Sequence, residues 1–367
     1  MTALVLRLAC LGLAAQIGMS LPLWLPMGLA LPPRASVFNG TGIPDLFLNA
    51  VLYVSVIQLF IWPERKFAIG LALLCMLMLV FNDINRLQPW FYFYALMLGT
   101  VVLSKRPETG MRWILASVYF WSGFYKITPW YADQNFAWFC EAFPFTAWAG
   151  KYPALGYLSA VLEMLMGVGL LWKKSRPFAR IFIVVFHVYI ILMLSPLGLN
   201  WNHVVLPWNA AMAGMVGVLF KNYDAGDLNL GKTGLWFAVV LAGVAPAAHL
   251  LNLWPFALSW TMYSNTQTEA VFFTQKETCT NLRDVWKKHA FDEGDKLLLD
   301  DWSMETRNTP LYNSEYHFRT LGKYLCGCQG STPDSSGIYL LKVNRWERGS
   351  DTLITIPCKE LLNPNTF

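Results

Sequence analysis

The sequence predicts an all-α polytopic membrane bundle of about nine spans, followed by a small α+β extracytoplasmic C-terminal domain. Apolar segments separated by short charged loops fill the chain from Met1 to about Leu251. The composition agrees, because 55% of the residues are hydrophobic and 14% are charged, whereas about a quarter of the residues in a soluble domain are charged. A membrane span needs roughly 20 mostly apolar residues to cross the hydrocarbon core, and this chain supplies that length about nine times.

The predicted spans follow one another with short connections. Pro22 and Pro26 interrupt the first apolar stretch, so we expect it to kink or to end early. Arg7 lies inside that stretch and apolar residues continue past Leu23, which argues against a cleavable signal peptide. The nine predicted spans are residues 3–30, 44–62, 67–82, 89–104, 111–127, 153–172, 178–196, 203–220 and 234–252.

Basic residues are divided unevenly between the alternate loops of this bundle. One set of loops contains eleven Lys and Arg residues, and the other set contains four, Arg34, Arg86, Lys126 and Lys151. Because Lys and Arg are retained on the cytoplasmic side, we expect a cytoplasmic N-terminus and a C-terminal domain on the outer side. In a Gram-negative bacterium this corresponds to an inner-membrane protein with a periplasmic C-terminal domain, which is the expected localisation. The net charge of +5 is therefore explained by the cytoplasmic loops and does not indicate nucleic-acid binding. The expected partner of the bundle is the lipid bilayer.

The tail after the last span loses the membrane character and predicts a separate domain. We expect a transmembrane bundle over residues 1–252, an aromatic-rich interfacial connector, helical in form, over 253–274, and the C-terminal domain over 275–367. In that domain residues 281–290 and 314–325 are typical of short helices. Residues 337–343 and 352–357 alternate and are β-branched enough for strands, and 345–349 is typical of a hairpin connection.

Four of the seven cysteines lie in the polar tail: Cys279, Cys326, Cys328 and Cys358. Four cysteines in a small exported domain favour two disulfides, and three pairings are possible. A metal site is the alternative, since Cys326 and Cys328 have a chelating spacing. A redox-active pair is a further alternative, although the tail contains no Cys-x-x-Cys.

Polar residues in or beside the spans are the candidates for chemistry, because such residues are costly in a membrane and face the bundle interior. These residues form four groups. In the predicted orientation, Glu163 with His187 lies about halfway down the bundle and the other three groups lie at the outer face, so all four can converge on one cavity. The groups are Asp83, Asn85, Arg86, Gln88 and Trp90; Ser122, Lys126 and Trp130; Glu163 with His187; and Asn202, His203, Trp208 and Asn209.

Glu163 is the most informative of these residues. A lone carboxylate among apolar neighbours must be protonated or paired, and His187 on the next span is its expected partner. A purely structural hydrogen bond between Glu163 and His187 is the alternative. Metal binding by Glu163, His187 and His203 is conceivable, but the spacing of residues on separate spans is not evidence for a metal site.

The other groups have structural alternatives of the same kind. Asp83 with Arg86 can be an interfacial ion pair, and Lys126 near a span end can reach the lipid headgroups. His203 and Asn209 can be helix-packing contacts, which are worth about 1 kcal/mol each in membranes.

Two runs of sequence carry a resemblance to known families. Residues 119–126, Tyr-Phe-Trp-Ser-Gly-Phe-Tyr-Lys, and 162–167, Leu-Glu-Met-Leu-Met-Gly, resemble the DoxX/MauE core, in which Ser-Gly-x-x-Lys ends one helix and Glu-x-x-x-Gly starts the next. Residues 83–90, Asp-Ile-Asn-Arg-Leu-Gln-Pro-Trp, with His187 and the pair 202–203, resemble the horizontally transferred transmembrane (HTTM) proteins related to vitamin K-dependent gamma-carboxylase. The resemblance covers roughly residues 40–260.

This resemblance implies a bundle that can hold a membrane quinone, or another quinone-like or lipophilic molecule, near the outer leaflet. The gamma-carboxylases use a reduced quinone, oxygen and carbon dioxide with a lysine as base, and Lys126 is the nearest analogue here. The expected function is a quinone-linked redox or carboxylase-like enzyme. Its expected catalytic residues are Lys126, Glu163 and His187, and its expected substrate-binding residues are Asp83, Arg86, Trp90, Asn202, His203 and Asn209.

Two functions of other classes stay open. The bundle can be a non-enzymatic assembly subunit whose external domain docks an exported or periplasmic protein. It can also be a small-molecule or ion transporter, although an inverted repeat, which would favour transport, is not found in the sequence.

Overall fold

The computed structural model describes residues 1–25, 32–38, 40–221, 236–274, 282–292, 294–328, 336–347 and 349–363. The chain divides into two compact units. The helical unit comprises Met1–Met19, Gly42–Leu79 and Leu87–Asn265. The sheet unit comprises Ser20–Thr41, Val80–Arg86 and Thr266–Phe367. Two short segments from the N-terminal part therefore belong with the C-terminal tail, which the expected division at residue 252 did not include.

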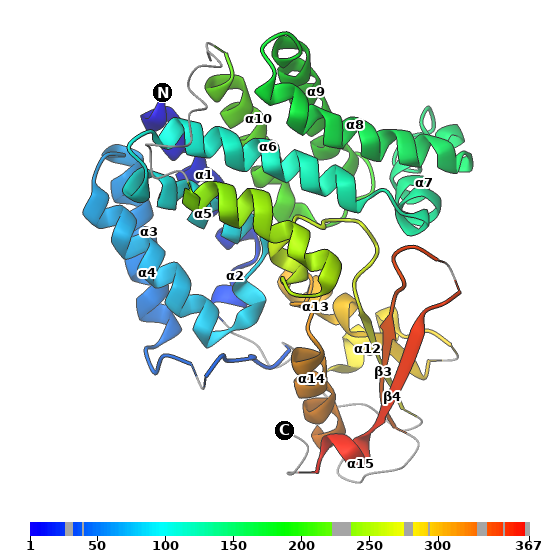
Figure 1. Ribbon diagram of the computed structural model, residues 1–367. Helices are drawn as coiled ribbons and strands as arrows, with labels where there is room; N and C mark the ends of the chain where they lie inside the picture. The colour runs from blue at the N-terminus through cyan, green and yellow to red at the C-terminus, as the bar shows by residue number, and fades with distance from the viewer. Residues whose placement is uncertain are drawn as a thin grey trace. The chain divides into compact units, whose positions relative to one another are not determined.

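Each predicted span contains helix in its described part (Figure 1). The first helix ends at Met19, before Pro22, which confirms that the first apolar stretch is cut short. The helices are α1 (Thr2–Met19), α3 (Asp45–Ile61), α4 (Lys66–Asn82), α5 (Pro89–Leu103), α6 (Pro107–Tyr125), α7 (Phe136–Cys140), α8 (Pro153–Leu171), α9 (Arg176–Leu194), α10 (Leu206–Leu219) and α11 (Trp236–Ala238). The shorter turns are the π-helical η2 (Tyr131–Asn135) and η7 (Val239–Val244), and the 3-10 turns η3 (Ala147–Lys151), η4 (His203–Val205), η8 (Ala245–Leu251) and η9 (Phe256–Leu258).

Proline marks the start of five of these helices. A proline occupies the first or second position of α5, α6, α8, α9 and α10. Its ring fixes φ near the helical value, and its missing N–H removes a donor that has no partner in the first turn of a helix. The sequence thus sets these helix starts locally, before any packing.

Within the described part of the chain, three helices are long and apolar enough to cross a membrane: α1, α8 and α9, with 18, 19 and 19 residues. At about 1.5 Å per residue, such helices approach the hydrocarbon thickness of about 30 Å. Shorter apolar helices cover Asp45–Ile61, Lys66–Asn82, Pro89–Leu103, His203–Leu219 and Trp236–Leu251. The count of nine spans therefore stays a prediction.

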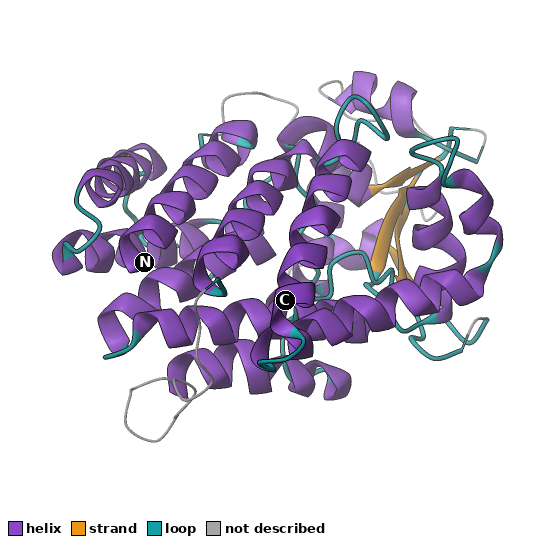
Figure 2. Ribbon diagram, turned by 90° about the horizontal axis from the view of Figure 1, so that it is seen from above, coloured by secondary structure: helices purple, strands orange, loops and turns teal. Residues whose placement is uncertain are grey.

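The sheet unit contains a four-stranded antiparallel sheet with strand order β2-β1-β3-β4. Figure 2 shows its strands in orange. The two strands and the hairpin predicted between residues 337 and 357 are confirmed, with Tyr339 opposite Thr355. The strands are β1 (Glu269–Phe273), β2 (Lys296–Leu298), β3 (Gly337–Lys342) and β4 (Thr352–Pro357). The helical elements are α2 (Leu21–Trp24), η1 (Ile84–Arg86), α12 (Arg283–His289), α13 (Leu299–Arg307), α14 (Glu315–Cys328) and α15 (Cys358–Leu361).

One face of this sheet builds the core of the unit. Phe272 on β1 and Leu340 on β3 point into it and meet Trp302 of α13 and Leu321 of α14. The expected interfacial helix over 253–274 is not found, because its last part forms β1 and pairs with β3. Sequence patterning missed β1 because its run Glu-Ala-Val-Phe-Phe does not alternate in polarity, although its burial does.

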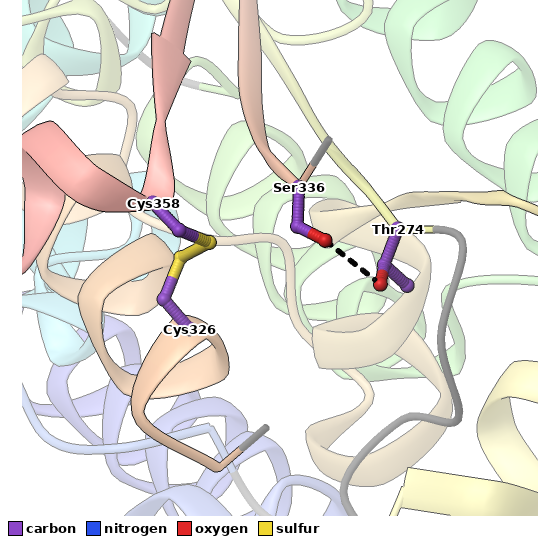
Figure 3. The surroundings of a disulfide bond; sticks show 4 residues. All are labelled: Thr274, Cys326, Ser336 and Cys358. Atoms are coloured by element: carbon purple, nitrogen blue, oxygen red, sulfur yellow. Dashed lines mark hydrogen bonds between the residues drawn. A yellow bond between two sulfur atoms is a disulfide. The ribbon is translucent and has the colours of Figure 1, made fainter. Parts of the chain in front are cut away.

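A disulfide joins Cys326, near the end of α14, to Cys358, which follows β4 directly (Figure 3). The two Cα atoms lie 5.5 Å apart. This pair confirms the disulfide prediction and removes Cys326 as a metal ligand. Cys328 is also disulfide-bonded, and Cys279 lies outside the described residues. Close to the cross-link, Ser336 Oγ and Thr274 Oγ1 form a 3.1 Å hydrogen bond between the start of β3 and the end of β1.

Candidate functional site

Two glycines bring helices α6 and α8 into backbone contact. A Cβ atom placed on Gly123 would lie 2.2 Å from the Met164 nitrogen, and one on Gly167 would lie 2.4 Å from the Ala116 oxygen. Small residues of this kind allow close helix packing in membranes. Gly123 lies one turn before Lys126, and Gly167 lies one turn after Glu163, so the contact faces carry both charged residues.

Lys126 and Glu163 form a buried ion pair across this contact. Lys126 Nζ lies 2.7 Å from Glu163 Oε2, and each side chain is 8% exposed. Nζ also donates to Ser122 Oγ at 3.0 Å, one turn earlier on α6. The expectation that Glu163 pairs with His187 is wrong. Sequence distance favoured the neighbouring span α9, but the glycine contact places α6 beside α8 and brings Lys126 to the carboxylate first.

His187 instead belongs to a chain of hydrogen bonds with Tyr119 and Asn209. Its Nε2 lies 2.6 Å from the Tyr119 hydroxyl, and its Nδ1 lies 2.7 Å from Asn209 Oδ1. Asn209 Nδ2 donates to the Val205 carbonyl, which leaves the amide oxygen for His187. Nδ1 therefore carries the proton and donates to Asn209, and Nε2 accepts from the Tyr119 hydroxyl.

Two further side chains surround the ion pair. The Tyr131 ring centroid lies 5.8 Å from Lys126 Nζ, within the range of a cation–π contact. Its hydroxyl lies 3.2 Å from Ser159 Oγ, one turn before Glu163 on α8. Sequence analysis did not name Tyr119, Tyr131 or Ser159 as site residues. Helical spacing could have found Tyr119, because residues 119, 122 and 126 lie on one face of α6.

A strained segment, residues 260–265, binds to this part of the helical unit. Trp260, Tyr263 and Asn265 all have positive φ, at 62°, 60° and 55°, which is rare and costly for residues other than glycine. The Ser264 carbonyl accepts from Thr128 Oγ1, two residues after Lys126. Such backbone strain persists where the surrounding contacts enforce it, and it often occurs at functional sites.

Of the predicted site residues just before α10, Asn202 contacts this segment. Asn202, itself in the left-handed conformation with φ 51°, donates from Nδ2 to the Tyr263 hydroxyl at 2.9 Å. His203 Nε2 lies 3.0 Å from Asn200 Oδ1, and nothing connects it to the ion pair among the described contacts.

The structure assigns the remaining predicted residues to other surroundings. Trp90 is buried on α5, against the edge of Phe91. Asp83 and Arg86 belong to the sheet unit. There Asp83 Oδ1 accepts from the backbone and side chain of Asn85, and Arg86 Nε donates to the Leu23 carbonyl. Their convergence with Lys126 on one cavity stays a prediction.

Among the described residues, no group of three His, Cys, Asp or Glu side chains is arranged to hold a metal ion. Comparison with known proteins found no family model, no curated protein and no solved structure that matches this chain. The functional argument therefore rests on the geometry of the chain itself.

Proposed function

We propose that this chain is a bacterial inner-membrane enzyme of the HTTM and DoxX type, with about nine spans, a cytoplasmic N-terminus and a periplasmic C-terminal domain. The proposed activity is a quinone-linked redox or carboxylase-like reaction. The Lys126–Glu163 pair is the proposed acid–base centre, and His187 with Tyr119 is the proposed proton path. The observation that carries this proposal is the buried ion pair at the glycine contact of α6 and α8.

A buried ion pair is a costly way to stabilise a fold, because the loss of hydration offsets most of the attraction. Lys126 also has donor capacity to spare. An ammonium has three N–H donors, and Nζ uses two of them, on Ser122 and Glu163, within the described chain. The third is available for a carbonyl or anionic group of a substrate.

The same geometry lets Lys126 act as a base. Transfer of one ammonium proton to Glu163 Oε2, 2.7 Å away, leaves a neutral amine with a free lone pair and a neutral carboxylic acid. As a general base, the amine would also have to lie within hydrogen-bonding distance of the substrate proton that it removes.

The donor set also fits a quinone. Lys126 would donate to a quinone carbonyl, with the aromatic ring of Tyr131 beside it. When bound, the quinone supplies or accepts the electrons of the reaction. The chain's own contribution is to hold the carbonyl, exclude water and move protons through the Tyr119 hydroxyl and His187.

The proposal is tested by analysing the organic extract of the purified protein by mass spectrometry. We expect stoichiometric quinone in the wild type and its loss in the variant Glu163→Gln, His187→Ala. His203→Ala is the matched control, because His203 lies outside the hydrogen-bond chain, and it should retain the quinone. An extract of wild type that contains bulk phospholipid alone would overturn the proposal.

A second candidate function is a non-enzymatic assembly subunit that docks an exported protein. The observation that favours it is the exposure of Trp346, at 65%, and of Leu353, at 60%, at the β3–β4 hairpin. An edge strand with exposed apolar residues is available for a partner strand. Site-specific crosslinking from residue 353 in cells should then capture one defined protein, and capture should not depend on Glu163.

A further inference from the structure

Helices α8 and α9 present an apolar face that no other described part of the chain covers. The exposed side chains recur every three or four residues, which is the repeat of one helix face. From residue 158 to 171 and from 181 to 194, all of which the structure describes, none of the exposed side chains is small, polar or charged. They include Leu158, Leu162 and Leu165 on α8 and Val185, Val188 and Leu192 on α9, each 40–62% exposed.

The small and ionisable residues of the two helices lie on their buried faces. Gly156, Glu163 and Gly167 are buried on α8, and His187 is buried on α9. Cβ atoms placed on Gly156 and Gly167 would lie within 3 Å of backbone atoms of other segments. Close packing and polar contacts therefore occur on one side of the hairpin, and large apolar side chains are left for the other side.

The turn between α8 and α9 satisfies backbone carbonyls at the end of α8. Buried Arg176 donates from Nε to the Leu170 carbonyl at 2.8 Å and from Nη2 to the Leu171 carbonyl at 3.0 Å. Ser175 Oγ donates to the Gly169 carbonyl at 3.1 Å. The last carbonyls of a helix have no partner within the helix, and such groups are costly in a bilayer unless the protein pairs them. This turn meets that requirement.

Exposed aromatic residues lie at both ends of the apolar face. Trp172 follows α8 and is succeeded by the exposed Lys173 and Lys174. At the other end Tyr152 precedes α8, with the Trp148 ring 6.2 Å away. Trp and Tyr concentrate at the headgroup level of membranes, and lysines there complement anionic headgroups. The 19 residues of α8 between these ends span about 28 Å, close to the hydrocarbon thickness of about 30 Å.

We propose that this face of the α8–α9 hairpin lies against the acyl chains of a phospholipid bilayer, with the two headgroup levels at Tyr152 and Trp172. Helices that associate within a membrane use small residues for close approach and polar residues for hydrogen bonds. This face has neither, so it suits lipid and does not suit a second copy of the chain. The inference rests on the proposed membrane location, but it does not depend on the proposed reaction.

Spin labelling of the full-length protein in vesicles of phosphatidylcholine and phosphatidylglycerol tests the proposal. The free cysteines Cys10, Cys75 and Cys140 are first replaced by alanine, and one new cysteine is then labelled in each sample. Electron paramagnetic resonance measures collisions of the label with oxygen, which concentrates in hydrocarbon, and with a water-soluble nickel chelate. Labels on exposed side chains leave the packing intact, so the variants should fold.

The ratio of oxygen to nickel collisions should be severalfold higher for Leu162→Cys and Val185→Cys than for Leu353→Cys. Leu353 is the matched control, because it is a similarly exposed leucine on β4 of the sheet unit. Trp172→Cys should give an intermediate ratio, as expected at the headgroup level. Since Leu162 is next to Glu163 in the sequence, its ratio also reports the depth of the ion pair.

Two results would contradict the assignment. Few collisions with either reagent at residues 162 and 185 would mean that protein covers the face, and dipolar broadening between the labels would identify that protein as a second copy. Frequent collisions with the nickel chelate would put the face in water, which would also contradict the proposed membrane location. A protein without quinone whose labels collide mainly with oxygen would refute the proposed reaction and support the lipid-facing hairpin.

Discussion

The two buried polar clusters of this protein differ in whether their charged and polar groups find hydrogen-bond partners within the chain. In the helical unit, the positive charge of Lys126 is matched within the chain by Glu163, and the tyrosine, histidine and asparagine beside them are hydrogen-bonded to one another. In the sheet unit, Arg307 and His317 are also buried, but four of their nitrogens have no hydrogen-bond partner within the described residues. The charged groups of the first cluster are thus matched within the chain, whereas the second cluster keeps unpaired donors.

The largest effect should come from breaking the first cluster. Glu163→Leu leaves the Lys126 ammonium buried without a counter-charge, and we expect a loss of about 3–5 kcal/mol in unfolding free energy. The double variant Lys126→Met, Glu163→Leu should regain most of this loss, since apolar residues often replace a buried pair without cost. Unfolding in detergent micelles measures both. If the double variant were as unstable as the single one, the loss of stability in Glu163→Leu would not come from the unpaired charge of Lys126.

The next largest loss of stability should come from removing the disulfide, which lies in the same unit as the buried Arg307 and His317. The cross-link between Cys326 and Cys358 closes a loop with a sequence separation of 32 residues, and it should contribute about 2–4 kcal/mol. This stabilisation offsets part of the cost of the unpaired nitrogens of Arg307 and His317. Replacing both cysteines by serine should lower the thermal midpoint measured by circular dichroism.

The matched control for the cross-link is Cys140→Ser, which removes a free thiol. It should change the thermal midpoint much less than the loss of the disulfide does. Equal effects would show that the cross-link does not stabilise the sheet unit.

A third variant tests whether the close packing of α6 and α8 holds the Lys126–Glu163 pair together. Gly123→Ala places a methyl group against the Met164 backbone, and overpacking of this kind costs about 1–3 kcal/mol. It should also separate Lys126 from Glu163 and reduce any activity. Gly18→Ala is the control, because nothing lies within 4 Å of a Cβ there. If both variants unfold at the same midpoint, the close approach of α6 and α8 does not hold the pair together.

The smallest effect should come from Asp300, a carboxylate in the sheet unit. Burial, opposed by a hydrogen bond from the Leu311 backbone and assisted by Asp301 and Glu269, raises the pKa of Asp300 from 3.8 to about 6. Between these two pH values the unfolded chain releases the proton and the folded chain keeps it, so stability decreases as the pH rises.

Asp300→Asn should therefore stabilise the protein by about 1–2 kcal/mol at pH 7.5 and have little effect near pH 4. Thermal unfolding at the two pH values tests this. Asp292→Asn, at an exposed residue paired with Lys296, should show no comparable gain. A gain from Asp300→Asn that is independent of pH would contradict the shifted pKa.

The helices could largely be predicted from the sequence because their signals are local. Apolar runs of 15 to 20 residues and prolines such as Pro89 and Pro153 fix where α5 and α8 begin. The strands β3 and β4 were also predictable, since a hairpin links two alternating segments. Strand β2, with three residues, and strand β1 carry too little local signal, and their pairing with distant segments defines them.

The candidate site was predictable in its members but not in its contacts. The sequence by itself determined that Lys126, Glu163 and His187 lie in apolar surroundings where each needs a partner. The tertiary structure decided the partners, because the approach of α6 to α8 depends on Gly123 and Gly167 facing each other. The burial of Arg307 and His317 was decided in the same way. They come from segments that are ordinary by themselves, and their burial arises only when α13 and α14 pack on the sheet.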